Sequence, residues 1–516
     1  MDTTRTAPRR TAPAAAVALA LSLAGCAVGP DFKPPAPPRV ADAARPYTAA
    51  AVPAATASAP GPGGAAQQLA LGQDVPGQWW QLFRSAPLDA LVRSALAHSP
   101  TVASAQAALR QAQALYDADV GAKTLPAVTG QAGAARERGS QATTGTPSGR
   151  VFSLYNASVN VSYSVDAFGA TRRELEGLQA GIDLQRWQVE AAALTLSANV
   201  VTTAIQEASL RAQLQATRDV IDAQQRALAV VQQQAALGAV AQQAVLVQRT
   251  QLAQTLATLP ALEKALAQTR QQLSVLAGRL PGDGGLPEFT LDSLQLPTEL
   301  PVTLPSALVR QRPDIQASEA QLHQASAQVG VATANLYPQI TLSGSLGAQS
   351  LQLDRLFSGP SQVWSLGGSL LAPIFNGGAL QARRRAAEAA YDQALAQYRQ
   401  TVLNAFLNVA NTLRALDSDA QALQAQATAA ALARQSLDLT TRQYQAGAVS
   451  SLLLLDAQRS LQQTRIGLAQ ARAARYADTA ALFQALGGGW WNRQALAPAG
   501  TPVAFDTAAP ASAPGR

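Results

Sequence analysis

The clearest pattern in this chain is an alternation of apolar and polar residues in two separate regions. In the first region the odd positions are apolar or aromatic and the even positions are small and polar: Tyr155, Ala157, Val159, Val161 and Tyr163 against Asn156, Ser158, Asn160 and Ser162. In the second region Ile340, Leu342 and Leu346 alternate with Thr341, Ser343 and Ser345. A period of two places the apolar residues on one face of a β-strand. The pattern predicts four strands, near 127–138, 154–165, 339–349 and 362–372, joined in pairs by Gly- and Ser-rich loops at 139–153 and 350–361.

Long Ala-, Gln- and Leu-rich stretches with almost no Gly or Pro predict very long helices. Two of them cover 170–236 and 379–445, and return helices are expected at 241–279 and 450–486. In the second long helix apolar and small residues recur every three or four positions, which is the spacing of a coiled-coil seam: Tyr391, Leu395, Tyr398, Val402, Ala405, Val409, Thr412 and Leu416.

The same series of signals occurs twice. Helical runs that end at Pro126 and Pro338 each precede a strand pair, and the sequence 237–240 (LGAV) returns as 446–449 (AGAV). We therefore predict two repeats, 79–300 and 301–489. A Pro- and Ala-rich linker or strap (26–78) precedes them, and a loosely ordered tail (490–516) follows.

No stretch after the N-terminus offers 18 consecutive apolar residues, so no transmembrane helix is predicted. A chain that crosses a membrane without such a helix must do so as a closed β-barrel. Four strands cannot close one, so the chain would pool its strands with copies of itself. Tyr155, Tyr163 and Trp364, near strand ends, would then be membrane-interface anchors. A soluble amphipathic hairpin would show the same alternation.

The first 25 residues have the composition of a signal peptide. Arg5, Arg9 and Arg10 precede an apolar run that ends in Leu23-Ala24-Gly25-Cys26. This ending resembles the lipobox of bacterial lipoproteins, in which the cysteine becomes the lipid-bearing N-terminus. The alternative is an ordinary signal peptide followed by an unrelated cysteine. Cys26 is the only cysteine, so an intramolecular disulfide is excluded. We expect a covalent lipid on Cys26, and no other cofactor.

Composition gives little support to catalysis or to nucleic-acid binding. The formal charge of +7 is spread along helices without a basic patch interleaved with aromatic residues. The two histidines, His98 and His323, lie in helical segments and are expected at a surface or interface. Neither belongs to a metal-ligand cluster, so no metal site is predicted. The glycine runs at 61–64 and 487–489 lack the lysine of a phosphate-binding loop and are expected to be linkers.

Taken in order, several short motifs resemble the TolC-like outer-membrane factors, and in particular their NodT-type lipoprotein branch. They extend over 79–486, nearly the whole mature chain: Trp79-Trp80, Leu88-Asp89 with Leu91, Arg312-Pro313-Asp314-Ile315, Tyr337-Pro338, Pro373-Ile374-Phe375-Asn376-Gly377-Gly378, and the run from Tyr444 to Leu461. The resemblance implies a mixed α and β membrane protein: a homotrimer with a 12-stranded transmembrane β-barrel, four strands per chain, above a long α-helical coiled-coil barrel.

The resemblance also implies a function, a location and partners. Such a chain would sit in the bacterial outer membrane, extend into the periplasm, and catalyse no reaction. It would pass small molecules, such as drugs or toxic solutes, from a periplasmic adaptor and an inner-membrane pump, expected to be of the RND type, to the exterior. The barrel-to-helix turns would contain Phe168, Gly169, Pro373, Phe375, Gly377 and Gly378.

A periplasmic gate is carried over from the family onto three positions. Leu452 would form an apolar ring, Asp456 an acidic ring, and Arg459 a nearby basic partner. Some family members have a second acidic position, which is Leu453 here. A solvated or salt-bridged Asp456 remains the plain alternative. For the whole protein, the alternatives are a type I protein-secretion channel, a non-conducting coiled-coil envelope lipoprotein, and an anchored periplasmic hydrolase.

Overall fold

The computed structural model describes residues 27–36, 47–48, 52–138, 151–303 and 305–493. The predicted signal peptide, Cys26 and the chain after Arg493 lie outside these residues. The chain forms two compact units. Unit 1 contains Leu109–Gln185 and Ser318–Arg399 together with N-terminal residues to Pro35; unit 2 contains Ala36–Ala108, Arg186–Ala317 and the chain from Gln400 onward.

Unit 1 contains a four-stranded antiparallel sheet of the kind that the alternation predicts. Its strands, in the order β2-β3-β5-β6, are β2 (Ala127–Arg138), β3 (Val151–Val165), β5 (Gln339–Ser350) and β6 (Gln362–Leu371). The expected strand positions are correct to within a few residues, because alternation together with glycine and proline at the ends marks strands well.

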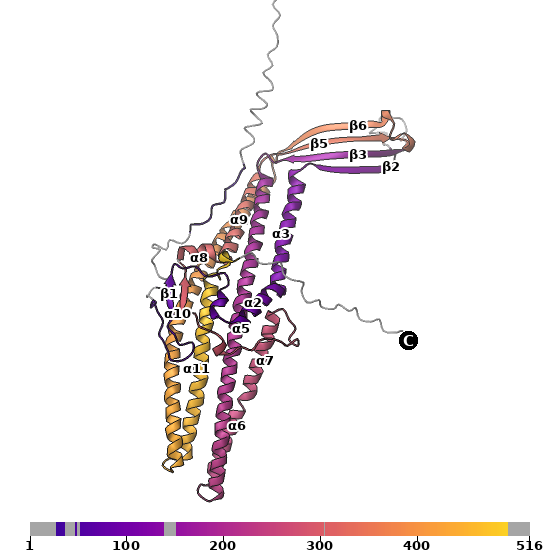
Figure 1. Ribbon diagram of the computed structural model, residues 1–516. Helices are drawn as coiled ribbons and strands as arrows, with labels where there is room; N and C mark the ends of the chain where they lie inside the picture. The colour runs from indigo at the N-terminus through magenta and orange to yellow at the C-terminus, as the bar shows by residue number, and fades with distance from the viewer. Residues whose placement is uncertain (1–26, 37–46, 49–51, 139–150, 304, 494–516) are drawn as a thin grey trace, which may run out of the picture. The chain divides into compact units, whose positions relative to one another are not determined.

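Each strand is joined to a long or medium-length helix, and all four junctions lie at the same end of the strands, as Figure 1 shows. These helices are α3 (Pro100–Thr124), α5 (Ala170–Ala236), α9 (Pro313–Ala334) and α10 (Ala379–Gln445). Both α5 and α10 have 67 residues. The seam expected in α10 is largely buried, since Tyr398, Val402, Ala405, Val409 and Leu416 are all nearly inaccessible to solvent.

The long helices end at the repeated sequences 237–240 and 446–449, each of which contains a glycine. Gly238 and Gly447 both adopt a left-handed backbone, with φ of 74° and 72°. The chain then returns through α6 (Gln242–Leu256) and α7 (Leu259–Leu276) in one half and α11 (Ser451–Ala485) in the other. The single helix expected over 241–279 is therefore divided. The break at Ala257–Thr258 directly precedes the first turn of α7, where Pro260 cannot supply a backbone N–H.

Unit 2 holds the main hydrophobic core. Its remaining elements are β1 (Gln68–Leu71), β4 (Glu299–Val302), α2 (Ala86–His98), α8 (Pro305–Gln311) and the short 3-10 helices Trp79–Phe83, Leu291–Ser293 and Trp490–Asn492. Strands β1 and β4 pair in parallel. The largest fully buried side chains of this core include Trp79, Phe83, Phe289, Tyr476 and Phe483.

The stretch 26–78, expected as a linker or strap, contributes to this core. Arg475 is fully buried, and its guanidinium donates to the carbonyl oxygen of Ala65 at 2.7 Å and to Thr56 Oγ1 at 2.8 Å. A buried charge needs such acceptors, so this arginine orders the segment before β1. Nor are Gly487 to Gly489 linker glycines: all three have positive φ, and Gly489 lies against the backbone of Val75 and Pro76.

Among the described residues, no helix is both long enough and apolar enough to cross a membrane.

Candidate functional site: the sheet, its helical turns and the helix tips

The sheet of unit 1 has one apolar and one polar face. Leu346 lies between Val159 and Trp364, and in the next row of the same face Gly344 lies between Val161 and Leu366. The opposite face carries serine, asparagine, threonine and glutamine, and the hydroxyls of Ser345 and Ser365 are 2.8 Å apart on adjacent strands.

In the single chain the apolar face is open to solvent. The exposed fractions of Leu366 and Trp364 are 83% and 77%. An apolar surface of this extent indicates contact with a membrane or with another protein. The outer strands, β2 and β6, each have one neighbour in this sheet, and an unpaired strand edge is a surface for further pairing.

The three predicted interface aromatics all lie on this apolar face. Tyr155 and Trp364 are in the half of the sheet away from the helices, and Tyr163 is near the helical end, opposite Leu342. This places aromatic residues toward both ends of one face, as an interfacial role requires.

The first strand-to-helix turn, 166–169, is capped and covered by its own chain. The carboxylate of Asp166 accepts hydrogen bonds from the backbone N–H groups of Thr171 and Arg172, both at 3.0 Å, and so satisfies free donors at the start of α5. The ring of Phe168 stacks on Tyr337, with centroids 4.9 Å apart. Gly169 has φ of 82°, which favours glycine, and is buried.

The segment 27–36, which directly follows Cys26 in the sequence, is held on this turn. From here on we use the name strap for residues 27–36 alone and not for the whole predicted stretch 26–78. The backbone N–H of Val28 donates to the carbonyl oxygen of Phe168 at 3.1 Å. A Cβ added at Gly169 would be 2.8 Å from the Cα of Ala27, and one added at Gly29 would be 2.6 Å from the Cα of Gly330. The backbones therefore approach so closely that glycine is required at both positions.

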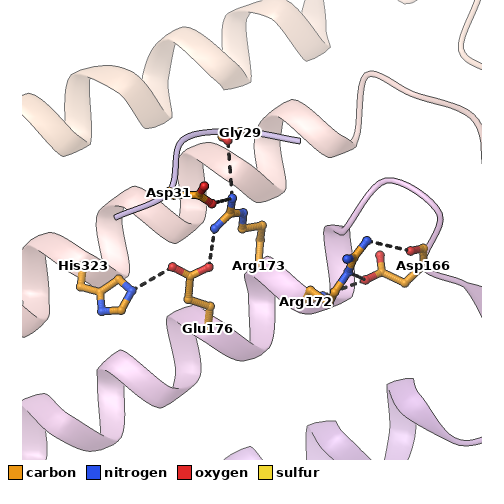
Figure 2. Close-up of polar contacts among 7 residues, drawn as sticks. All are labelled: Gly29, Asp31, Asp166, Arg172, Arg173, Glu176 and His323. Carbon is orange, nitrogen blue, oxygen red and sulfur yellow. Dashed lines mark hydrogen bonds and ion pairs between the residues drawn. The ribbon is translucent and has the colours of Figure 1, made fainter. Parts of the chain in front are cut away.

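Arg173 of α5 binds the strap, and its neighbour Glu176 connects this contact to His323 of α9, as Figure 2 shows. Its side chain is only 7% exposed and donates to Asp31 at 2.5 Å and to Glu176 at 2.7 Å. The hydrogen bond from Arg173, and then its charge, lower the pKa of Asp31 below the usual range. Glu176 in turn lies 2.8 Å from Nε2 of His323, whose ring stacks on Phe32 of the strap with centroids 4.2 Å apart.

Sequence reasoning missed this cluster, although it placed His323 at a surface or interface. One signal was available. Two arginines, Arg172 and Arg173, stand in the first turn of α5, where the helix dipole disfavours positive charge. Such a position calls for nearby carboxylates, and Asp31, Asp166 and Glu176 supply them.

The second turn, 373–378, occupies the same place between strand and helix but is bare. The exposed fractions of Ile374 and Phe375 are 97% and 91%. Gly377 and Gly378 have φ of 63° and 83°, and a Cβ at either would meet no atom within 4 Å. Pro373 is exposed as well.

The three gate positions lie near the start of α11. Leu452 is 64% exposed and Asp456 is also exposed. Arg459 donates from Nε to the Oε1 atom of Gln251 on α6 at 2.6 Å, and no ion pair joins it to Asp456 in the described part of the chain. Near the C-terminal ends of α5 and α10, which are the ends away from the sheet, the hydroxyl of Tyr444 donates to Gln234 at 2.8 Å. Within one chain, Leu452 and Asp456 therefore remain open to another molecule.

Over the described residues, no group of three or more His, Cys, Asp or Glu side chains could hold a metal ion. His98 is exposed, with its Nδ1 atom 2.9 Å from the carbonyl oxygen of Ser94.

Comparison with known proteins gives a consistent result. The sequence model of the family described as outer membrane efflux protein matches residues 91–279 and 304–488. The pyoverdine export outer membrane protein OpmQ of Pseudomonas aeruginosa is 35% identical over 430 residues, which cover 81% of this chain and 89% of OpmQ. The probable outer membrane lipoprotein SilC of Salmonella typhimurium is 30% identical over 339 residues, which cover 65% of this chain and 73% of SilC.

The fold matches solved channels. The structure of the outer-membrane channel OprN superposes with a TM-score of 0.81 at 29% identity, covering 90% of this chain and all of OprN.

Proposed function

Because this chain belongs to the outer membrane efflux protein family and is an outer-membrane efflux channel protein, we propose that three copies form one conduit. Each copy contributes β2, β3, β5 and β6 to a 12-stranded transmembrane barrel, and its helices continue the conduit into the periplasm as an α-helical barrel. The conduit passes solutes and has no catalytic step.

The observation that carries this proposal is the two-faced sheet with its two outer strands. Its apolar face suits lipid and its face of serine and asparagine suits a wet lumen. Strand β6 runs antiparallel to β2, as the alternating directions of the four strands require. Hence β6 of one copy can pair with β2 of the next and keep the barrel fully antiparallel, which removes every open edge.

The partners and the anchor are part of the same proposal. Cys26 carries a covalent lipid, a role that the similarity to the probable lipoprotein SilC supports. A periplasmic adaptor and an inner-membrane pump of the RND type deliver small molecules to the helical end. The polar face offers hydroxyl and amide groups of several kinds, which suit a permissive conduit whose cargo is selected upstream.

The gate belongs to the proposal too. Three copies of Leu452 and of Asp456 would converge on the channel axis, one ring resisting wetting and the other favouring cations. Arg459 is engaged with Gln251 in the single chain. It would therefore hold α11 against α6 rather than neutralise Asp456.

The first test is planar-bilayer conductance of the purified protein, with its oligomeric mass measured in the same detergent. We expect a trimer with small, cation-leaning conductance. A protein that stays monomeric and never conducts would overturn the proposal and leave a coiled-coil envelope lipoprotein.

A matched pair of variants tests the orientation of the sheet. Leu366→Lys places a charge on the lipid face, at a cost of about 2 to 4 kcal/mol per copy at mid-membrane, and should strongly reduce insertion. Ser365→Lys, one residue away, points to the lumen and should insert while changing conductance. Equal loss of insertion in both variants would contradict the assignment of the faces.

For the gate, Asp456→Ala and Leu452→Ser should both raise single-channel conductance, and Asp456→Ala should also reduce cation preference. Unchanged conductance in both would remove these residues from the gate without affecting the channel itself. Passage of an unfolded polypeptide, but of no small solutes, would favour a type I secretion channel.

A further inference from the structure

Two helices of unit 1 present charged faces that their own chain leaves unused. Arg110 and Asp117 on α3, and Arg385 and Asp392 on α10, are all exposed, and none forms an ion pair or hydrogen bond with another described residue. In both pairs the two charges are opposite and seven residues apart, which puts them on one face of a helix, two turns from each other.

On α10 this face points away from α9. Leu380, Arg383 and Ala387 line a small groove together with residues of α9. At about 100° per residue, Arg385 lies on the opposite side of α10 from that group, and Asp392 lies below it on the same side. Between and beside them are the small residues Ala389 and Ala396, both exposed.

On α3 the face points away from α5. Lys123 forms an ion pair with Glu174 of α5 at 2.5 Å, and from Leu109 onward the half-buried residues of α3 lie on that same side. Arg110 and Asp117 lie on the other side, next to Ala114 and Gly121. No atom comes within 4 Å of a Cβ placed on Gly121, so this face has open space in front of it.

The order of the strands decides which helices become neighbours in the proposed trimer. The helices follow the strands in the order α3, α5, α9, α10, so α10 of one copy adjoins α3 of the next. The two helices run in opposite directions, because α3 ends at the sheet and α10 begins there.

Distance from the sheet can be counted along each helix. Within one chain such counting agrees with the spacing: a Cβ added at Gly177 would lie 3.4 Å from the Cβ of Ala327, and each residue is seven positions from the sheet end of its helix. By the same count Asp117 and Arg385 lie about 10 Å and 9 Å from the sheet ends of α3 and α10, and Arg110 and Asp392 lie about 21 Å and 20 Å from them. Unlike charges therefore meet at both levels.

We propose that Asp117–Arg385 and Arg110–Asp392 form a two-rung ladder of ion pairs between α3 of one copy and α10 of the next. Ala114 and Ala389 lie between the rungs, with Gly121 and Ala396 just beyond them, and these small residues let the helices approach closely. The ladder sets the vertical register between copies, as paired charges do along coiled coils. It rests on the proposed function, since it requires the trimer.

Thiol cross-linking of the full-length protein in detergent tests the register, with all four positions serving as their own controls. Asp117→Cys with Arg385→Cys, and Arg110→Cys with Asp392→Cys, should yield chains linked to one another by a short bifunctional maleimide. The crossed combinations, Asp117→Cys with Asp392→Cys and Arg110→Cys with Arg385→Cys, should not. Cys26 is kept throughout, and the protein without added cysteines gives the background.

Charge exchange is the second readout. Asp117→Arg should lower the fraction of trimer that survives mild heating by roughly tenfold, since it affects three interfaces at once. Arg385→Asp added to it should restore that fraction. Two results in a protein that is trimeric would overturn the ladder and leave the channel proposal intact. One is cross-linking as efficient in the crossed combinations as in the matched ones. The other is no recovery of the heat-resistant trimer fraction in the double variant. A protein that is monomeric before any substitution would overturn both.

Discussion

The two turns that join strands to the 67-residue helices occupy equivalent places, but only the first is covered by other parts of the chain. The first turn, 166–169, has a capping carboxylate, a stacked aromatic ring and the strap lying over it. The second turn, 373–378, displays Ile374 and Phe375 almost fully to solvent. Both follow a strand of the same sheet, but only the first is covered by a segment distant in the sequence.

The difference shows which turn is buried by contacts within one chain and which turn leaves its apolar side chains exposed to other molecules. The first turn is at the centre of the sheet, after β3, and the chain covers it with its own strap. The second follows the outer strand β6. In the proposed channel it borders the next copy and the membrane interface, where exposed aliphatic and aromatic side chains are stabilised.

The largest expected effect comes from removing the residue that fastens the strap. Arg173→Ala deletes the hydrogen bonds that a nearly buried guanidinium donates to two carboxylates, one of which, Asp31, belongs to the strap. Hydrogen exchange of the Val28 amide, which bonds to the first turn, should therefore accelerate by about 100-fold. Arg383→Ala, in α10 near the second turn, is the control and should leave this amide unchanged. Unaltered protection in Arg173→Ala would mean that Arg173 does not hold the strap.

The second comparison replaces the phenylalanine of each turn by alanine, one turn at a time. Phe168→Ala removes the stack with Tyr337, and we expect the opening free energy of the strap to fall by about 2 kcal/mol. Phe375→Ala removes a ring that packs on no other described ring, so Val28 exchange should stay constant. Only membrane insertion should respond to Phe375→Ala. Equal effects on Val28 in both variants would erase the distinction between the turns.

A finer comparison uses two glycines with the same backbone angle. Gly169 and Gly378 have φ of 82° and 83°, so alanine costs about 1 kcal/mol of backbone strain at either position. Only at Gly169 would the new methyl also meet the strap. We expect Val28 exchange to be about tenfold faster in Gly169→Ala than in Gly378→Ala. Identical exchange would show that the strap is not in contact with the turn in solution.

The smallest effect is a pH dependence. Arg173 lowers the pKa of Asp31 in the docked state from its ordinary value of 3.8. This contribution is therefore fully present above that ordinary value and is lost as the pH falls through the lowered one. The protection factor of Val28 should be constant from pH 7 to about 5 and should decrease below about pH 4. In Asp31→Asn it should be reduced at every pH, without this additional decrease.

Much of the fold follows from periodicity. Strict alternation located the four strands, and the apolar spacing of three and four indicated α10, because each period is imposed directly by the geometry of its element. Composition with almost no Gly or Pro indicated α5. The repeated sequences 237–240 and 446–449 lie at the ends of these two helices, where Gly238 and Gly447 adopt a left-handed backbone. The family, and with it the efflux function, also followed from motifs that sequence alone displays.

What sequence reasoning did not supply depends on contacts between residues far apart in the chain. Asp31 meets Arg173 across 142 positions, and Arg475 orders a segment more than 400 positions earlier. Periodicity carries no information about such pairs. The contacts that residues 26–78 make with the rest of the chain could therefore not be predicted from it.

The sequence by itself therefore determined which stretches are strands and helices, and which family they compose. Only the tertiary structure decided that one turn is covered and the other open, and which charges of α3 and α10 stay unpaired. The physical reason is that element type depends on neighbours along the chain, whereas burial and pairing depend on which groups the fold brings within a few ångströms.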